Sequence, residues 1–198
     1  MIEIIDLKQE EPYLIFKLNY QKALDADEKS IEAISISSYN KKLNEVNSRF
    51  VNLKFIKNDE FIFFSNYDSP KSIDFCSHNQ IAALIYWPSI KFQIRMKAEI
   101  KKTSYEFNQK YFFDRSKEKN ALAISSKQSK KIGSFLQVKE NYNKSLINDD
   151  LKKCPKYWGG FSFTPYEIEF WEGNEFRLNK RNLYIKDNAS WNHFILEP

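Results

Sequence analysis

The sequence predicts an α+β protein, an antiparallel barrel of strands that carries helices on its side. Short strand-like segments fill the first half of the chain and return in its last third, and a charged, helix-favouring stretch at residues 104–151 separates them. The 198 residues are 42% apolar and 16% aromatic, which is enough for one domain with a substantial core. We therefore expect a single domain over residues 1–198, with residues 1–11 as a flexible N-terminus.

The N-terminal half predicts one helix followed by a meander of strands. Leu14, Ile15 and Leu18 have the spacing of one helix face, so a helix is expected over residues 12–26. Short apolar or alternating runs, separated by turn-like segments at residues 39–48 and 57–59, predict strands at residues 33–37, 49–56, 60–66, 80–88 and 91–103. The run at 80–88 is apolar enough for burial on both faces, whereas 91–103 alternates like a half-exposed strand.

The second half predicts two helices and three further strands. Helices are expected at residues 104–115 and 132–153, and strands at residues 159–171, 175–186 and 190–198. Gly159 and Gly160 would begin the first of these strands where two backbones pass closely, and Gly173 would turn the hairpin that follows.

Composition excludes several classes of function. The formal net charge of +5 is modest, and basic runs such as residues 125–131 are typical of solvated helix faces, so no nucleic-acid partner is expected. Two distant cysteines are expected to be free thiols, and the two histidines lie in no ligand-spaced motif, so no metal is expected. The sequence has neither a long apolar span nor a leader pattern, which predicts a cytoplasmic protein without membrane contact.

A phosphate-bearing ligand would have to be held by side chains. With four glycines in the chain, no glycine-rich phosphate loop can be formed, and Arg or Lys beside hydroxyl groups is the usual substitute. Such groups stand at four places near strand or helix ends: Arg49 with Lys54, Ser65 with Ser69 and Lys71, Gln128 with Ser129, and Arg177 with Arg181. Because no nucleophile or metal motif is present, an organic cofactor is the natural carrier of any enzymatic chemistry.

The blocks that hold these residues resemble a known family. They are residues 49–56, 63–72, Gln93, 110–115, 126–134 and 157–181, in the family's order over nearly the whole chain. The chain is thereby identified as resembling the pyridoxamine 5'-phosphate oxidases, FMN-dependent oxidoreductases of vitamin B6 metabolism with an FMN-binding split β-barrel. The resemblance implies oxidation of pyridoxamine or pyridoxine 5'-phosphate to pyridoxal 5'-phosphate, with oxygen as the electron acceptor, by a homodimer.

The resemblance also implies the roles of individual residues. FMN would be bound by Arg49, Phe50, Leu53, Lys54, Phe64, Ser65, Lys71, Gln93, Gln128, Ser129, Trp171 and Arg181, some of them from the second subunit. The phosphate-bearing substrate would be bound by Lys54, Tyr111, Arg115, Lys119, Arg177 and Asn179. Arg177 and Asn179 would be the catalytic pair at the pyridine ring.

The sequence departs from the family pattern at four places. Asn179 stands where the family has histidine, Lys119 where it has serine, and Pro70 where it has a basic residue; the N-terminal substrate-covering segment has no counterpart before Pro12. Asparagine can form hydrogen bonds but cannot titrate near neutral pH. Two alternatives follow: a relative that oxidises another compound, as in the phenazine-pathway branch, or a protein that binds flavin or pyridoxal phosphate without turnover.

Overall fold

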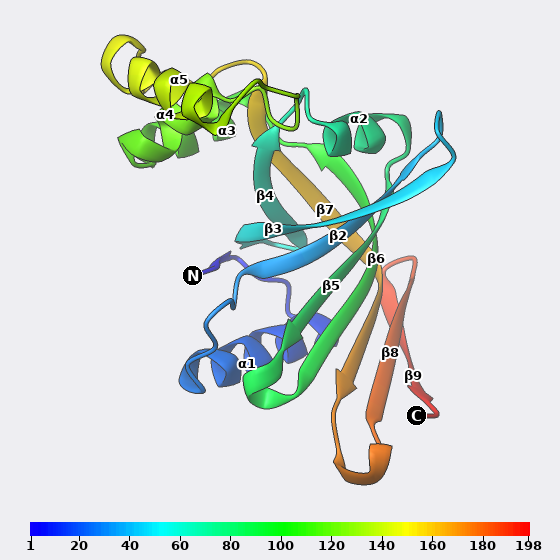
Figure 1. Ribbon diagram of the computed structural model, residues 1–198. Coiled ribbons are helices and arrows are strands. Elements are labelled where there is room, and N and C mark those ends of the chain that lie inside the picture. The colour runs from blue at the N-terminus through cyan, green and yellow to red at the C-terminus, as the bar shows by residue number, and fades with distance from the viewer.

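The computed structural model describes residues 1–198 and contains a closed barrel of six antiparallel strands (Figure 1). Going round the barrel, the strands are β2 (Ala33–Asn40), β3 (Glu45–Lys57), β4 (Glu60–Asn66), β7 (Trp158–Glu172), β6 (Phe92–Lys102) and β5 (Gln80–Trp87), which pairs with β2 again. β8 (Lys180–Asp187) and β9 (Ser190–Leu196) extend the sheet beyond β7, and β1 (Glu3–Ile5) runs parallel to β3. The predicted α+β barrel is confirmed.

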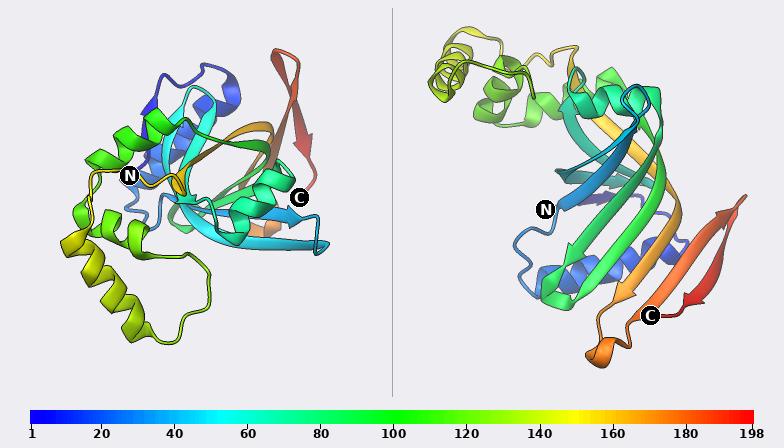
Figure 2. Two further views of the ribbon diagram at one scale, coloured as in Figure 1. Left: turned by 90° about the horizontal axis from the view of Figure 1, so that it is seen from above. Right: turned by 45° about the vertical axis from the view of Figure 1, so that its right-hand side comes forward.

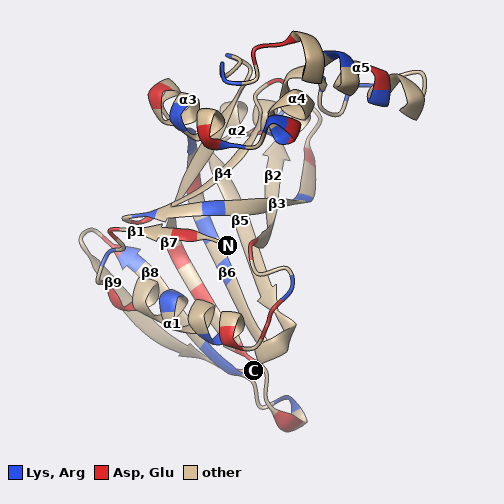
Figure 3. Ribbon diagram, turned by 90° about the vertical axis from the view of Figure 1, so that its left-hand side faces the viewer, with Lys and Arg blue, Asp and Glu red and all other residues tan.

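Five helices flank the barrel at its two ends. α1 (Glu11–Asp25) lies at one end, and α2 (Pro70–Ser77), α3 (Tyr105–Asp114), α4 (Lys117–Ser125) and α5 (Phe135–Asn148) lie at the other (Figures 1 and 2). Both acidic and basic residues occur on α3, α4 and α5 (Figure 3). None of the helices has the length and apolar character required to cross a bilayer.

The predicted first helix exists, but it buries a different face from the expected one. Leu14 and Leu18 are 41% and 57% exposed, whereas Tyr13, Phe16 and Tyr20 are buried. Phe16 packs edge-on against Phe61 and Trp87 inside the barrel. The aromatic rings bury more apolar area than the leucines could, and this area determines how the helix is rotated on the barrel.

Most strand predictions are confirmed, with three corrections. The strand expected at residues 175–186 begins only at Lys180, because residues 175–177 form a short 3-10 turn. The segment expected to be a turn at residues 39–48 is mostly strand, because β2 and β3 pair up to Asn40 and Glu45 and leave only residues 41–44 as the turn. β5 is not buried on both faces: its residues alternate between buried and exposed, and Leu84 and Tyr86 are 39% and 51% exposed.

Short elements at three places were not predicted individually. α2 follows β4 directly, and α4 lies within the charged stretch between the two expected helices. Residues 1–11, for which a flexible terminus is expected, include β1 and place the side chains of Ile2 and Leu7 in the core. These elements are too short for an amphipathic pattern to show in the sequence.

The glycine pair lies near the start of β7, as expected, but side chains rather than a second backbone pack closely on it. A Cβ added to Gly159 would overlap the hydroxyl of Tyr67 and the amide of Asn108, and one added to Gly160 would lie 2.6 Å from Thr103 Oγ1. Gly173 follows β7 directly, in the turn that leads to β8, as expected, but its own backbone is not left-handed. The left-handed positions are Phe176 and Arg177, with φ of 55° and 61°, and Gly173 instead packs under the ring of Trp171.

Substitution of Gly159 by alanine is expected to lower the free energy of unfolding by about 1–3 kcal/mol, because the new methyl group must displace buried, hydrogen-bonded side chains. Gly133→Ala is the matched control, since its Cβ would lie 3.4 Å from one flexible side chain, that of Gln137. Urea denaturation of both variants measures the difference. Equal stability of the two variants would contradict the close approach at Gly159.

Candidate active site

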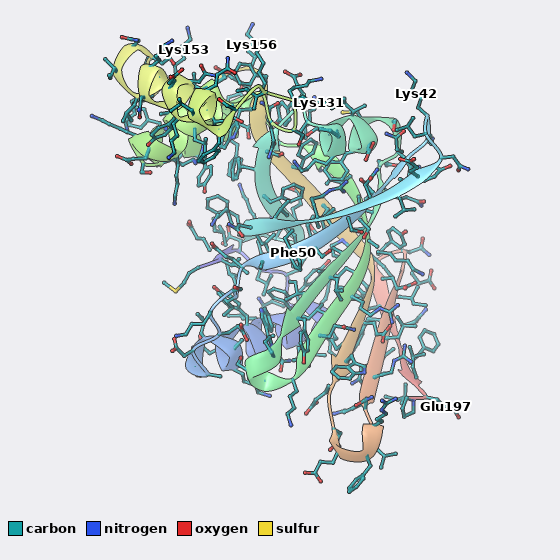
Figure 4. All side chains as sticks on the ribbon, viewed as in Figure 1. Lys42, Phe50, Lys131, Lys153, Lys156 and Glu197 are labelled. Atoms are coloured by element: carbon teal, nitrogen blue, oxygen red, sulfur yellow. The ribbon has the colours of Figure 1, made fainter.

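A cavity of about 310 Å³ lies between the middle of β3, the end of β4 and the helices α3 and α4. Nine of the residues singled out from the sequence line it: Phe50, Lys54, Phe64, Ser65, Lys71, Tyr111, Arg115, Lys119 and Gln128. Val51, Asn52 and Trp158 complete the lining. Phe50, labelled in Figure 4, is 75% exposed at this site. The tertiary structure thus brings together residues from five of the sequence blocks that are far apart in the chain.

One group of polar residues surrounds Lys71, in the first turn of α2. Lys71 Nζ donates hydrogen bonds to Ser65 Oγ at 3.2 Å and to Ser69 Oγ at 3.4 Å, and Ser65 Oγ donates to Gln128 Oε1 at 3.1 Å. The helix starts here because Pro70 fits the first helical position and keeps Ser69 extended. Hydroxyls and an ammonium group on a rigid strand end can hold a phosphate group.

Arg49 on β3 belongs to the same group and is anchored by a buried carboxylate. Its Nη1 donates to Ser38 Oγ at 2.7 Å and to the carbonyl of Ile36 at 3.2 Å, while Nη2 lies 3.9 Å from Asp74 Oδ2. Asp74 is 1% exposed and accepts hydrogen bonds from Ser38 Oγ and Asn40 Nδ2. This carboxylate fixes the guanidinium beside the cavity.

Burial lowers the pKa of both cationic side chains, Arg49 and Lys71. Burial lowers the pKa of Arg49, against the opposing charge of Asp74, and the pKa of Lys71 is lowered first by burial and then by the charge of Arg49. Lys71 has hydroxyl partners but no carboxylate within ion-pair distance. Two cations near one buried carboxylate therefore leave a net positive charge that a bound anion would compensate.

Replacing Asp74 with asparagine is expected to lower the free energy of unfolding of the flavin-free chain by about 1–3 kcal/mol, because Arg49 loses its counter-charge and one of the two donors, Ser38 Oγ or Asn40 Nδ2, loses its acceptor. Asp68→Asn, at an exposed carboxylate close by in the chain, is the control and should change stability by less than about 0.5 kcal/mol. Urea denaturation compares the two variants. A loss at Asp74 no larger than that at Asp68 would show that Arg49 does not depend on this carboxylate.

A second group of residues forms an aromatic wall with cations on it. The ring of Tyr111 stacks on Phe64 at 3.9 Å between centroids, and Phe64 stacks on Trp158 at 5.1 Å. The guanidinium of Arg115 lies 4.5 Å from the centroid of the Trp158 ring. Burial raises the pKa of Tyr111 and lowers that of Arg115. This wall can receive a flat ring with a negative group.

The remaining expected residues lie elsewhere in the chain. Gln93, Trp171 and Arg181 form one row across β6, β7 and β8, in which Trp171 pairs with both neighbours. Arg177 and Asn179 follow in the turn that begins β8, at the end of the molecule opposite to α3 and α4 (Figure 1). One chain therefore does not bring these five residues to the cavity.

Two further expected residues lie beside the cavity rather than in it. The side chain of Leu53 is fully buried in the core, so contact with a ligand would use its backbone. Ser129 lines a neighbouring cavity between α4 and α5.

Five residues of the site were not predicted individually from the sequence: Val51, Asn52, Trp158, Asp74 and Glu32. Val51 and Asn52 lie within the quoted block at residues 49–56. Trp158 lies in the aromatic segment quoted for the family resemblance, so its signal was present. Asp74 and Glu32, which is paired with Lys54 at 2.8 Å, gave no signal, because single carboxylates on a helix and before a strand are usually solvated.

Comparison with known proteins shows which family the chain resembles. Residues 158–198 match the family model described as the pyridoxine 5'-phosphate oxidase C-terminal dimerisation region. A pyridoxine/pyridoxamine 5'-phosphate oxidase of Colwellia psychrerythraea is 34% identical over 169 residues, which cover 84% of this chain and 77% of the relative.

Two solved structures share the fold. PhzG from Burkholderia lata, in complex with tetrahydrophenazine-1-carboxylic acid, superposes with a TM-score of 0.90 at 23% identity, covering 96% of this chain and 93% of that one. A pyridoxamine 5'-phosphate oxidase-related, FMN-binding protein of Nostoc punctiforme gives a TM-score of 0.81 at 11% identity, covering 96% and 100%. The barrel and these relatives together show that the chain belongs to the pyridoxine/pyridoxamine 5'-phosphate oxidase family and is an FMN-dependent oxidoreductase of that type.

Proposed function

We propose that the chain oxidises pyridoxamine or pyridoxine 5'-phosphate to pyridoxal 5'-phosphate with oxygen as the electron acceptor. The observation that carries the proposal is that two cationic groups meet at one cavity, with Arg49 beside the cavity and the other cations in its lining. Lys71 and Arg49 suit the phosphate of FMN, and Lys54, Arg115 and Lys119, with the hydroxyl of Tyr111, suit the phosphate of the substrate. A cofactor and a substrate that both carry phosphate would fill both groups.

The residues of the chain fit FMN by their donor chemistry. The half-buried Lys71 has only hydroxyl partners, and the phosphate of FMN would supply the missing negative charge. Ser65, Gln128 and the backbone near Leu53 would complete the cradle. FMN held there would supply the hydride acceptor and the electron transfer to oxygen, so the residues of the chain would chiefly position the substrate.

We further propose that the active form is a homodimer. The matched family region is described as a dimerisation region, and it leaves large apolar side chains exposed: Phe176 at 91%, Leu178 at 68% and Ile195 at 69%. A partner would bring Gln93, Trp171, Arg177, Asn179 and Arg181 to the cavity of the first chain. There Arg177 would orient the substrate ring and Asn179 would donate a hydrogen bond to it.

A second candidate is oxidation of a different ring compound by the same flavin. Asn179 favours it, because its Oδ1 accepts a hydrogen bond from the backbone of Asn174 at 3.2 Å and so takes part in closing the turn. The related PhzG was solved with a tetrahydrophenazine carboxylic acid, a ligand with a carboxylate in place of a phosphate.

Oxygen consumption by the FMN-loaded protein separates these candidates. Pyridoxamine 5'-phosphate should be consumed with formation of the aldehyde, which is followed by its absorbance. Turnover of tetrahydrophenazine-1-carboxylic acid but not of pyridoxamine 5'-phosphate would favour the second candidate.

Sedimentation of the purified protein tests the homodimer and should give twice the mass of one chain. A monomer that turns over substrate would contradict the site shared between two chains.

A further inference from the structure

Three cations line the part of the cavity that faces α3 and α4, and their surroundings differ. They are Lys54 on β3, Arg115 at the end of α3 and Lys119 in the first turn of α4. A phosphate dianion needs about two positive charges nearby to bind well out of water. Which of the three cations supply that charge depends on what else each of them contacts.

Lys54 is already paired with a carboxylate. Its Nζ lies 2.8 Å from Glu32 Oε1, and the two side chains are only 28% and 26% exposed. The other oxygen of Glu32 lies 3.3 Å from the amino group of Met1. Burial alone would raise the pKa of Glu32, but the hydrogen bond and charge of Lys54, with the charge of the Met1 amino group, outweigh it and lower the pKa. Glu32 therefore stays ionised and cancels most of the charge that Lys54 would offer.

Arg115 and Lys119 have no carboxylate partner. Arg115 lies over the Trp158 ring, and its Nη1 and Nη2 donate to Asn120 Oδ1 at 3.2 Å and to the carbonyl of Lys119 at 3.5 Å, both neutral acceptors. Lys119 is exposed at the mouth of the cavity and is held by no ion pair. The uncompensated charge at this end of the cavity is thus that of Arg115 and Lys119.

We infer that Glu32 is a specificity-determining residue: it neutralises Lys54, so that Arg115 and Lys119 anchor the anionic group of the substrate. The inference rests on the proposed function, since it assumes a substrate with a negative group. It has two consequences. Removing the charge of Glu32 should tighten binding of a phosphorylated ligand, and removing that of Lys119 should weaken it.

The test measures binding of 4-deoxypyridoxine 5'-phosphate, which lacks the oxidisable group, and of 4-deoxypyridoxine, to the FMN-loaded protein by calorimetry. Glu32→Gln should tighten binding of the phosphorylated ligand about tenfold and leave binding of 4-deoxypyridoxine unchanged, because the positive charge of Lys54 is then no longer compensated. Lys119→Met should weaken binding of the phosphorylated ligand about tenfold. The double variant Glu32→Gln with Lys54→Met should not show the tighter binding expected for Glu32→Gln alone. Glu45→Gln removes an exposed carboxylate from the same strand as Lys54 and is the charge-matched control.

The outcomes distinguish this inference from the proposed function. If the original chain binds the phosphorylated ligand and Glu32→Gln does not tighten it, the inference is wrong and the proposed function stands. If only the Glu32→Gln variant binds the phosphorylated ligand, the proposal of a vitamin B6 substrate is wrong and the inferred role of Glu32 stands. Binding by no variant would overturn both. If Glu32→Gln does not fold, Lys119→Met decides: unchanged affinity would overturn the inference.

Discussion

A Lys71→Met variant is expected to bind FMN about a hundredfold more weakly than the unmodified chain, while its affinity for riboflavin stays the same. A hydrogen bond between a charged donor and a charged acceptor contributes about 1.5–3 kcal/mol, and every 1.4 kcal/mol is a factor of about ten in affinity. Riboflavin lacks the phosphate group, so the loss should be confined to FMN. Quenching of flavin fluorescence during titration measures both affinities.

The control for this prediction is another lysine with a different environment. Lys101 on β6 is 69% exposed and paired with Glu60 at 2.6 Å, away from the cavity. Lys101→Met should leave both flavin affinities unchanged. Equal weakening of FMN and riboflavin in Lys71→Met would mean that Lys71 supports the isoalloxazine ring or the fold, and the phosphate assignment would be withdrawn.

Replacing Arg177 with alanine is expected to lower kcat by about a hundredfold to a thousandfold, with little change in FMN affinity. Loss of one positioned donor at a reacting centre costs about 2.7–4 kcal/mol. Arg177 is exposed in a left-handed conformation in the turn before β8, with φ of 61°, and its side chain has no partner within its own chain. A residue held in a costly conformation without a local contact is consistent with a role across a dimer interface.

Arg181→Ala provides the contrast. Arg181 Nε donates to Glu169 Oε1 at 2.9 Å, and Glu169 also pairs with Arg95 at 3.0 Å, so the guanidinium is fixed in the row with Trp171. Its loss should raise the dissociation constant of FMN at least tenfold, because a fixed charged donor is removed. Stopped turnover with intact FMN binding in Arg181→Ala, together with flavin loss in Arg177→Ala, would reverse the two assignments.

The pattern of the chain predicted the barrel because its strands are regular. β4 was placed at its observed bounds, and β6 was recognised from its alternation of buried and exposed residues. The rotation of α1 was not predictable, since Tyr13 and Phe16 form as good a helical stripe as Leu14 and Leu18. Only the cavity that the barrel offers at Phe61 and Trp87 selects between the two faces.

The candidate site was predicted in part for a similar reason. Charged and hydroxyl residues in quoted blocks, such as Lys71, Arg115 and Gln128, were identified by their order in the chain, and the structure brings them to one cavity. Asp74 and Glu32 were not predicted, because the role of a carboxylate depends on which cation lies next to it in the folded chain. Arg49 and Lys54 lie 25 and 22 residues away from them along the chain.

The sequence by itself determined the fold class, the family and the residue types that a flavin and an anionic substrate require, because periodicity and motif order are properties of a linear chain. The tertiary structure decided which charges remain free. Asp74 lies beside Arg49 and Glu32 beside Lys54, while Arg115 and Lys119 have no carboxylate partner. Electrostatic energy depends on distance and burial, which a sequence does not contain.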